Sequence, residues 1–237
     1  MSTYVYGIAR AAQSLPEQLD GIGNPPRPVR TVTSGRLTAL VSEAPEELKA
    51  KRRDLVAHQR VIIEAAASGP VLPMRFGGVS TDDDTVAAVL REHEEHYLER
   101  LDALQGKDEY NVKASHDEEA VLYRVLGDDA ELRALSEANR AAGGGSHQQK
   151  LQLGERVARA VQERERRDAE LVESVLRPLA AAVNHGPESG SWLANISFLV
   201  EREHDRRFLD AVRQLHVDHP HLAVQVSGPL PAYSFAD

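Results

Sequence analysis

The stretch WLANISFLVE, residues 192–201, gives the clearest secondary-structure signal in the chain. Every second residue in it, from Trp192 to Val200, is apolar. Successive side chains of a β-strand point to opposite faces, so this period of two predicts a strand that buries one face. The segments on either side of it indicate the kind of domain to which the strand belongs.

Those flanking segments predict an α+β domain with a long helix. Alternation at Tyr110, Val112 and Ala114 predicts an earlier strand, and residues 222–226 predict a later one. The order strand, long helix, strand, helix, strand is that of a ferredoxin-like unit in which one strand is missing or degenerate. We therefore predict a modified ferredoxin-like domain over residues 107–237. The helical patterns that separate its strands cover residues 117–140, 149–184 and 204–217.

Two further features belong to this second domain. Asp117 and Asp128 precede helical patterns, and a short acidic side chain in that place can accept a hydrogen bond from the first helical turn. We expect both to act as N-caps. Three consecutive glycines, residues 143–145, predict a flexible loop near residues 141–148.

The first half of the chain also mixes strands and helices, and we predict an N-terminal α+β domain over residues 1–106. Its second helix begins at the acidic cluster of residues 82–84, which favours the positive end of a helix dipole. We expect an uninterrupted stripe along this helix, which includes His93 and Tyr97, and an end at Gly106. The other predicted elements are a strand at residues 4–9, a hairpin at 29–34 and 36–42, a helix at 51–67 and an extended run at 71–76.

Composition excludes several classes of function. The chain has 237 residues, which fits one large domain or two of ordinary size. A net charge of -9 argues against nucleic-acid binding, which needs positive charge to neutralise phosphates. The absence of cysteine excludes disulfides, thiolate nucleophiles and iron–sulfur clusters. We find no signal-peptide pattern and no apolar run of about 18 residues, so we expect a cytoplasmic protein that does not enter a membrane.

The histidines are the main candidates for metal binding. His216, His219 and His221 lie within six residues, but Pro220 interrupts any helix there and the spacing is not a helical i, i+4 pair. A polar turn explains them more simply. His58 and His93 fall on apolar helix faces, and we expect each to make an interior hydrogen bond.

Other catalytic patterns are missing as well. The chain has no G-x-S-x-G elbow, phosphate loop or complete dinucleotide fingerprint. Adjacent carboxylates on a helix face different directions, so they do not form acid–base pairs. We therefore predict no catalytic, cofactor-binding or metal-binding residue, and no enzymatic activity.

Four segments carry the most specific sequence signal in the chain, and they occur in the order Tyr4–Ile8, Val71–Gly77, Gly106–Lys113 and Gly228–Phe235. In this order and spacing they resemble the GvpL/GvpF family of gas vesicle proteins, across nearly the whole chain. This chain departs from the family pattern at three positions. Tyr110 stands where relatives commonly have Trp, and Leu230 and Ala232 replace a Trp and a Pro of the terminal segment. That loss weakens the case for a stacked or rigid contact by the tail, but the resemblance to the family holds.

The resemblance implies a non-enzymatic accessory or minor structural protein. Such a protein would act in gas vesicle assembly by binding the main shell protein and other vesicle proteins, without a cofactor. It would be cytoplasmic and associated with gas vesicles. The family-motif positions, to which we assign a role in the fold or in partner contact, are Tyr6, Gly7, His58, Pro73, Arg75, Phe76, Gly77, Lys107, Glu109, Tyr110, Lys113, Gly228, Pro229 and Tyr233.

Some of these positions suggest specific structural roles. Pro73 fixes extended backbone at a strand start or edge, and Gly77 permits a turn that a side chain would obstruct. We expect Arg75 to pair with carboxylates, and Glu109 and Lys113 to pair with a neighbouring strand.

Two other kinds of function stay open at this point. A ferredoxin-like scaffold hosts many activities, so a metal-dependent protein that uses His216, His219 and His221 is one alternative. A module that binds a small molecule between its domains is the other.

Overall fold

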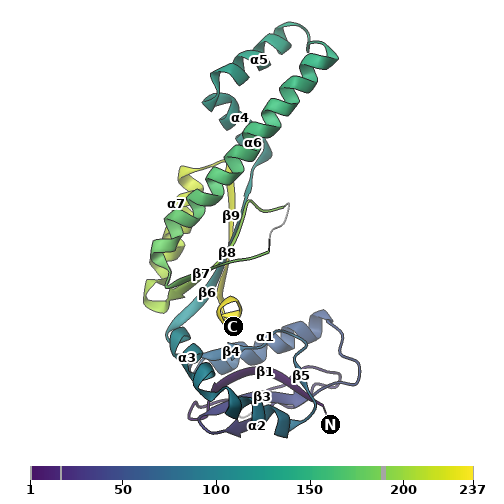
Figure 1. Ribbon diagram of the computed structural model, residues 1–237, viewed down its shortest axis with the longest axis vertical. Helices are drawn as coiled ribbons and strands as arrows, with labels where there is room; N and C mark the ends of the chain where they lie inside the picture. The colour runs from purple at the N-terminus through teal and green to yellow at the C-terminus, as the bar shows by residue number, and fades with distance from the viewer. Residues whose placement is uncertain (1, 17, 188–190, 237) are drawn as a thin grey trace. The chain divides into compact units, whose positions relative to one another are not determined.

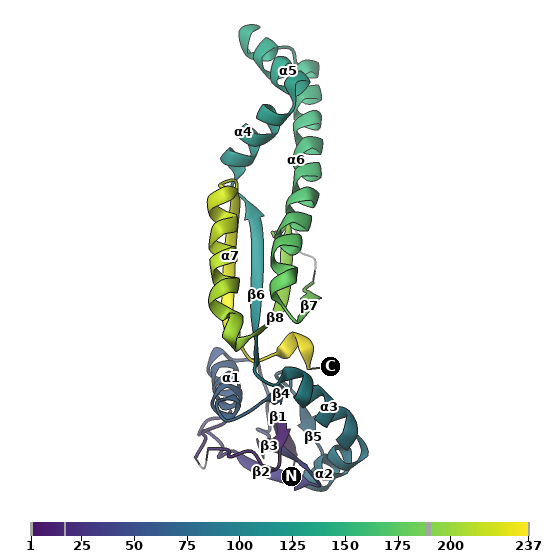
Figure 2. The same cartoon turned by 90° about the vertical axis from the view of Figure 1, so that its left-hand side faces the viewer.

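The computed structural model describes residues 2–16, 18–187 and 191–236 (Figures 1 and 2). The chain divides into two units. The first comprises Met1–Glu109 together with Gly228–Asp237, and the second comprises Tyr110–Ser227. The C-terminal segment thus groups with the first unit, and not with the rest of the predicted domain of residues 107–237.

Strand β1 (Thr3–Arg10) is the central strand of the first unit's sheet. It pairs antiparallel with β3 (Leu37–Glu43) on one side and with two short strands, β4 (Val71–Pro73) and β5 (Val79–Ser80), on the other. The predicted hairpin is confirmed, because β2 (Arg30–Ser34) pairs with β3. Both faces of β1 are buried, so helices are needed on both sides of this sheet.

Helix α1 (Arg52–Ala66) covers one face, and α2 (Asp83–Glu92) and α3 (Glu94–Leu104) cover the other (Figure 2). Asp82 caps α2, since its carboxylate accepts a 2.8 Å hydrogen bond from the Thr85 backbone N–H. The prediction of one uninterrupted helix here was wrong.

The predicted helix is interrupted at His93, whose backbone leaves the helical region at φ −110° and ψ 21°. This residue is exposed rather than part of an apolar stripe. Because the interruption changes the helical phase, Leu98 takes the buried position and Tyr97 is half-buried.

The second unit contains a four-stranded sheet in the order β7-β8-β6-β9. Its strands are β6 (Lys107–His116), β7 (Ala182–His185), β8 (Ala194–Glu201) and β9 (Leu222–Leu230). Helices α6 (His147–Leu176) and α7 (Asp205–Asp218) pack against this sheet through a core that includes Tyr110, Phe198 and Phe208. The chain order strand, helices, strand, strand, helix, strand matches a ferredoxin-like unit.

Strand β7 is the one that the predicted order lacked relative to a ferredoxin-like unit. The expected helix at 149–184 is too long, because α6 ends at Leu176 and a short 3-10 turn that contains Pro178 follows. Proline cannot continue the helical hydrogen bonds. The residues after it pair with β8, from Ala182 opposite Leu199 to His185 opposite Ile196.

The remaining helices, α4 (Glu118–Asp128) and α5 (Ala130–Ala141), lie beside the part of α6 that extends beyond the sheet (Figure 1). Asp117 caps α4 as expected. The cap of α5 is Asp129, which accepts a 2.9 Å hydrogen bond from the Leu132 N–H, and not Asp128. The three glycines at 143–145 all have positive φ, and Ser146 begins α6 with a capping box.

Within the described ranges, no helix combines the length and the apolar character required to cross a bilayer.

Replacing Phe208 with alanine tests the second core. Phe208 is fully buried, and its ring centroid lies 5.3 Å from that of Tyr110 and 5.4 Å from that of Phe198. We expect F208A to lower the free energy of unfolding by about 3–5 kcal/mol. Val217 lies in the same helix and is 68% exposed, so V217A should change the free energy of unfolding by less than about 0.5 kcal/mol. Urea denaturation measures both, and equal effects would contradict this packing.

Candidate functional site

Four of the family-motif positions meet in the first unit, in a cluster that we call the motif core. It consists of Tyr4, Tyr6, His58, Phe76 and Tyr233. Tyr4 and Tyr6 come from β1 and His58 from α1, while Phe76 and Tyr233 pack against the same hydrophobic core. Three family segments and one helix therefore contribute to one cluster.

His58 links three of these elements by hydrogen bonds. Its Nε2 lies 2.9 Å from the Met74 carbonyl oxygen, and its Nδ1 lies 2.9 Å from the Tyr4 hydroxyl. A carbonyl oxygen only accepts, so Nε2 carries the proton and Nδ1 accepts from Tyr4. Burial lowers the pKa of His58 and raises the pKa of Tyr4. Both side chains are therefore neutral near pH 7, and the expected interior hydrogen bond is present.

Tyr6 connects the cluster to the loop before β2. Its hydroxyl accepts a 2.9 Å hydrogen bond from the Ile22 N–H and lies 2.9 Å from Ser42 Oγ. The ring stacks on His58 at 5.5 Å and contacts Tyr4 edge-on at 4.9 Å between centroids. Burial raises the pKa of Tyr6, so this group too serves as a neutral structural hydrogen-bonding partner.

Two motif glycines are required by backbone geometry. A Cβ on Gly7 would lie 2.9 Å from the Leu72 carbonyl oxygen, because β4 approaches β1 closely with Pro73 opposite Gly7. Gly77 has φ +105°, a conformation that L side chains rarely adopt. Arg75 lies just before this turn and is exposed.

The C-terminal tail is fixed by a buried carboxylate. Glu109 is 4% exposed, and it accepts hydrogen bonds from the Ser234 N–H at 2.8 Å and the Ser234 hydroxyl at 2.7 Å. Arg100 donates to the Phe235 carbonyl oxygen at 2.7 Å. Burial and the Glu109 charge raise the pKa of Tyr233 to about 12. These hydrogen bonds give the tail a fixed contact, although the aromatic ring and the proline of the family pattern are absent from it.

The other motif positions have local roles. Lys107 donates to the Ala103 carbonyl oxygen at 2.9 Å. Tyr110 belongs to the second core, and Lys113 Nζ lies 5.5 Å from the centroid of the Trp192 ring. Glu109 thus binds the tail, and Lys113 contacts an aromatic ring that precedes β8. Gly228 and Pro229 lie in β9 and are joined by a cis peptide bond.

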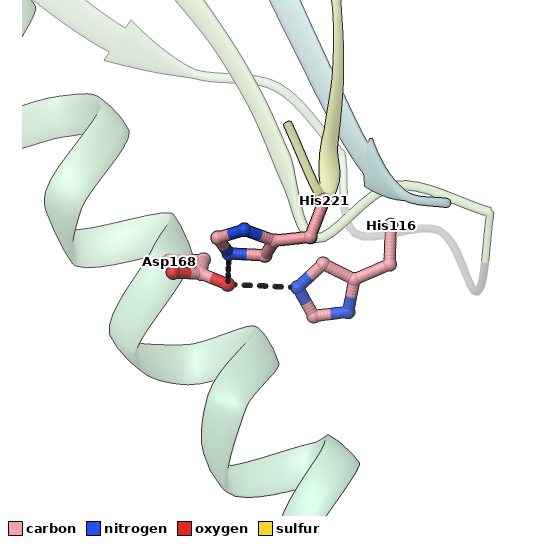
Figure 3. Close-up of side chains that lie close together, drawn as sticks. All are labelled: His116, Asp168 and His221. Carbon is pink, nitrogen blue, oxygen red and sulfur yellow. Dashed lines mark hydrogen bonds and ion pairs between the residues drawn. The ribbon is translucent and has the colours of Figure 1, made fainter. Parts of the chain in front are cut away.

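The second unit contains a buried polar group that we call the His–Asp–His cluster: His116, Asp168 and His221 (Figure 3). The Nε2 atoms of both histidines lie 2.9 Å from the same Asp168 oxygen, Oδ2. Arg164, one helical turn before Asp168, donates to this carboxylate at 2.9 Å. Burial alone would raise the pKa of Asp168, but hydrogen bonds from His116 and Arg164 hold it well below its usual range.

Sequence reasoning missed this cluster, although its signals were present. His116 continues the buried alternation of β6, and Asp168 precedes Val172 and Leu176 at spacings of four and eight residues. Both positions therefore face the core. The structure does not bring His216 into this cluster with His221, because His216 Nδ1 lies 3.0 Å from the Leu222 carbonyl oxygen. The ring of His219 packs against that of His221, at 5.9 Å between centroids.

The His–Asp–His cluster is the natural place to look for a metal in the second unit. One ligand atom from each residue lies within 4.8 Å of the others. However, Arg164 Nη2 lies 2.9 Å from Asp168 Oδ1 and 3.2 Å from His221 Nε2. A guanidinium already supplies the positive charge that balances the carboxylate, and a divalent cation would be repelled by it. The geometry therefore favours a hydrogen-bonded network over a metal centre.

The tail contact is tested by replacing Glu109 with alanine. This change removes the acceptor of two hydrogen bonds, so we expect a loss of about 1–3 kcal/mol in unfolding free energy. Carboxypeptidase should also digest the tail faster. The exposed Glu99 on α3 serves as the control, and E99A should behave like the parent chain. Unchanged digestion of E109A would contradict the assigned role.

Comparison with known proteins agrees with the fold and the motifs. The chain matches the family model for "Gas vesicle synthesis protein GvpL/GvpF" over residues 2–237. It is 65% identical over 238 residues to Gas vesicle protein F of Streptomyces sp. (strain CB03234), with all of both chains covered. It is 29% identical over 256 residues to Gas vesicle protein L of the same organism, which covers 98% of this chain and 92% of the relative.

Two crystal structures share this architecture. Gas vesicle protein GvpF from Anabaena sp. PCC7120 matches with a TM-score of 0.79 and 25% identity, over 100% of this chain and 98% of that chain. GvpF from Microcystis aeruginosa matches in fold with a TM-score of 0.75, at 22% identity, over 100% of this chain and 99% of that chain. Because the family model matches this chain over residues 2–237, the chain belongs to the GvpL/GvpF family of gas vesicle proteins.

Proposed function

We propose that this chain is a non-enzymatic accessory or minor structural protein that acts in gas vesicle assembly. In this proposal it binds the main shell protein and other vesicle proteins, and it is cytoplasmic and associated with the vesicles. The observation that carries the proposal is full-length identity of 65% to a gas vesicle protein F. Identity to the L protein of the same organism is 29%, which supports an F-type assignment.

The arrangement of polar groups supports a role without catalysis. His58 is hydrogen-bonded through both ring nitrogens, Glu109 binds the tail, and Asp168 is balanced by Arg164. A general acid or base must reach a substrate proton, and these buried groups are instead engaged with other parts of the chain. The proposal therefore gives the family-motif residues a structural role and assigns partner binding to the surface.

One surface of the first unit has the properties that binding an apolar partner requires. A cavity of about 210 Å³ lies between the sheet and helices α2 and α3. At this cavity Val79 is 48% exposed and Val89 is 39% exposed. Its lining is largely apolar and consists of Val5, Ile8, Ala39, Met74, Gly78, Val79, Ser80, Val86, Val89, Leu90 and Tyr97.

A short strand edge lies beside this cavity. Strand β5 pairs with β1, and within the described ranges no strand is paired with its other edge. An unpaired edge can accept a strand from another chain, while a neighbouring pocket selects its side chains. In our proposal a shell-protein segment adds to this edge and places an apolar side chain in the cavity. The motif Val71–Gly77 supports this proposal, since it leads directly into β5 and Met74 lines the cavity.

Replacing Val79 with aspartate tests the proposed surface. A charge at the cavity would oppose burial of an apolar partner, so we expect recovery of the shell protein in a pairwise co-purification to fall by about tenfold. Val217 is exposed in the second unit, and V217D makes the same chemical change there without affecting recovery. Thermal unfolding should be similar for both variants.

Two outcomes of this experiment would count against the proposal. Equal recovery with V79D, V217D and the parent chain would reject this surface. Recovery of no vesicle protein by the parent chain, at low and moderate salt, would reject the proposed function itself.

A further inference from the structure

The His–Asp–His cluster joins three elements that are distant in the sequence. His116 is the last residue of β6, His221 directly precedes β9, and Asp168 lies in α6. The three side chains are 7%, 5% and 1% exposed, respectively. Figure 3 shows both imidazole rings directed at the carboxylate from the strand side. These contacts hold α6 against the ends of two strands.

The cluster is balanced in charge only while its histidines are neutral. Asp168 contributes one negative charge and Arg164 one positive charge, and they are in direct contact. A proton on either histidine would therefore leave a net positive charge in a buried site, which is costly. On His221 that charge would lie against Arg164, whose Nη2 is 3.2 Å from the ring Nε2.

Hydrogen bonding ties His116 to α6. Its Nε2 bonds to Asp168, and its Nδ1 faces away from that carboxylate (Figure 3). Among the described residues, no group is a hydrogen-bond partner of this buried Nδ1. The hydrogen bonds that hold this ring therefore depend on Asp168.

The groups around the cluster do not offset an added proton. From α4, Asp128 lies 3.4 Å from Arg164 Nη1 but also pairs with Arg124. From the loop before α4, Asp117 directs its carboxylate to the Ala120 N–H. From the turn before β9, the ring of His219 lies 5.9 Å from that of His221 and adds no negative charge.

We propose that the His–Asp–His cluster is an acid-sensitive latch, which holds α6 on the sheet at neutral pH and releases it when His221 is protonated. The proposal rests on the position of the cluster and is independent of the partner-binding role proposed above. The region that opens would comprise the middle of α6, the end of β6 and the turn before β9.

The direction of the pH dependence follows from His221. Burial lowers its pKa below the ordinary value of 6.5, and Arg164 and His116 lower it further, while Asp168 partly opposes them. In the open state the ring regains its ordinary pKa. The closed state therefore keeps its full stability above about pH 6.5 and loses stability as the pH falls below that value. Asp168 stays ionised throughout this range, because its pKa is also lowered.

Hydrogen–deuterium exchange of the full chain at pH 7.5 and pH 5.5 tests the latch. After correction for intrinsic exchange, we expect protection in peptides covering residues 160–172 and 216–224 to fall by about tenfold at pH 5.5. Protection around β1 and α1 should not change. Equal protection of all these peptides at both pH values would overturn the proposal.

Variants identify the groups that respond. The double variant His116→Gln with His221→Gln keeps polar side chains but cannot take up protons, so its protection should be the same at both pH values. His204→Gln is the control, because His204 is exposed beside Glu201 and Glu203, and it should keep the parent's pH dependence. A double variant that also keeps that dependence would contradict the latch.

A second measurement decides the question if the double variant fails to fold. An NMR titration of the parent chain follows the ring protons of His221 and the amides of α6 together. The latch requires His221 to titrate below 6.5 and the α6 amides to shift over the same pH range. Titration of His221 at or above 6.5, or α6 amides that do not change, would overturn it.

Discussion

The first unit depends on one requirement: the polar atoms of its buried aromatic residues must be hydrogen-bonded. His58 meets this requirement for three elements, since it accepts from the Tyr4 hydroxyl and donates to the Met74 carbonyl. An unpaired buried group costs about 1–3 kcal/mol, so α1, β1 and the segment after β4 keep one relative position. Tyr6 extends the same network to the Ile22 backbone.

In the second unit, charged groups satisfy the requirement that buried polar atoms be hydrogen-bonded. Asp168 is almost fully buried in α6, and Arg164 and two histidines satisfy it. Such a network is stable only in one protonation state, whereas the Tyr4–His58 bond is between neutral groups. The two units thus differ in how they respond to acid. Both units use polar side chains to position helices on sheets.

Much of the fold could be predicted from the periodic spacing of apolar residues along the sequence. The alternation in β6 and β8 is strong because each strand turns one apolar face to the second core, and these strands define the ferredoxin-like order. Strand β1 is instead apolar on both faces, and both are buried. Features that depend on tertiary contacts were harder to predict from the sequence. Strand β7 has only four residues and is defined by its pairing with β8. The helix break at His93 involves no proline or glycine, so the sequence does not indicate it. The partners of Asp168 lie 52 and 53 residues away, so helical spacing could indicate its burial but not the histidines it meets.

The central claim is that the family motif acts by holding the first unit together, while partner contact occurs at its surface. The most direct test is a His58→Leu variant, which removes both hydrogen bonds and replaces the imidazole with an apolar side chain. Urea unfolding and shell-protein recovery are measured on the same preparation. The account predicts a loss of about 1–3 kcal/mol in unfolding free energy, with recovery falling only as the folded fraction falls. Unchanged stability with recovery abolished would contradict it, since His58 would then act in partner contact.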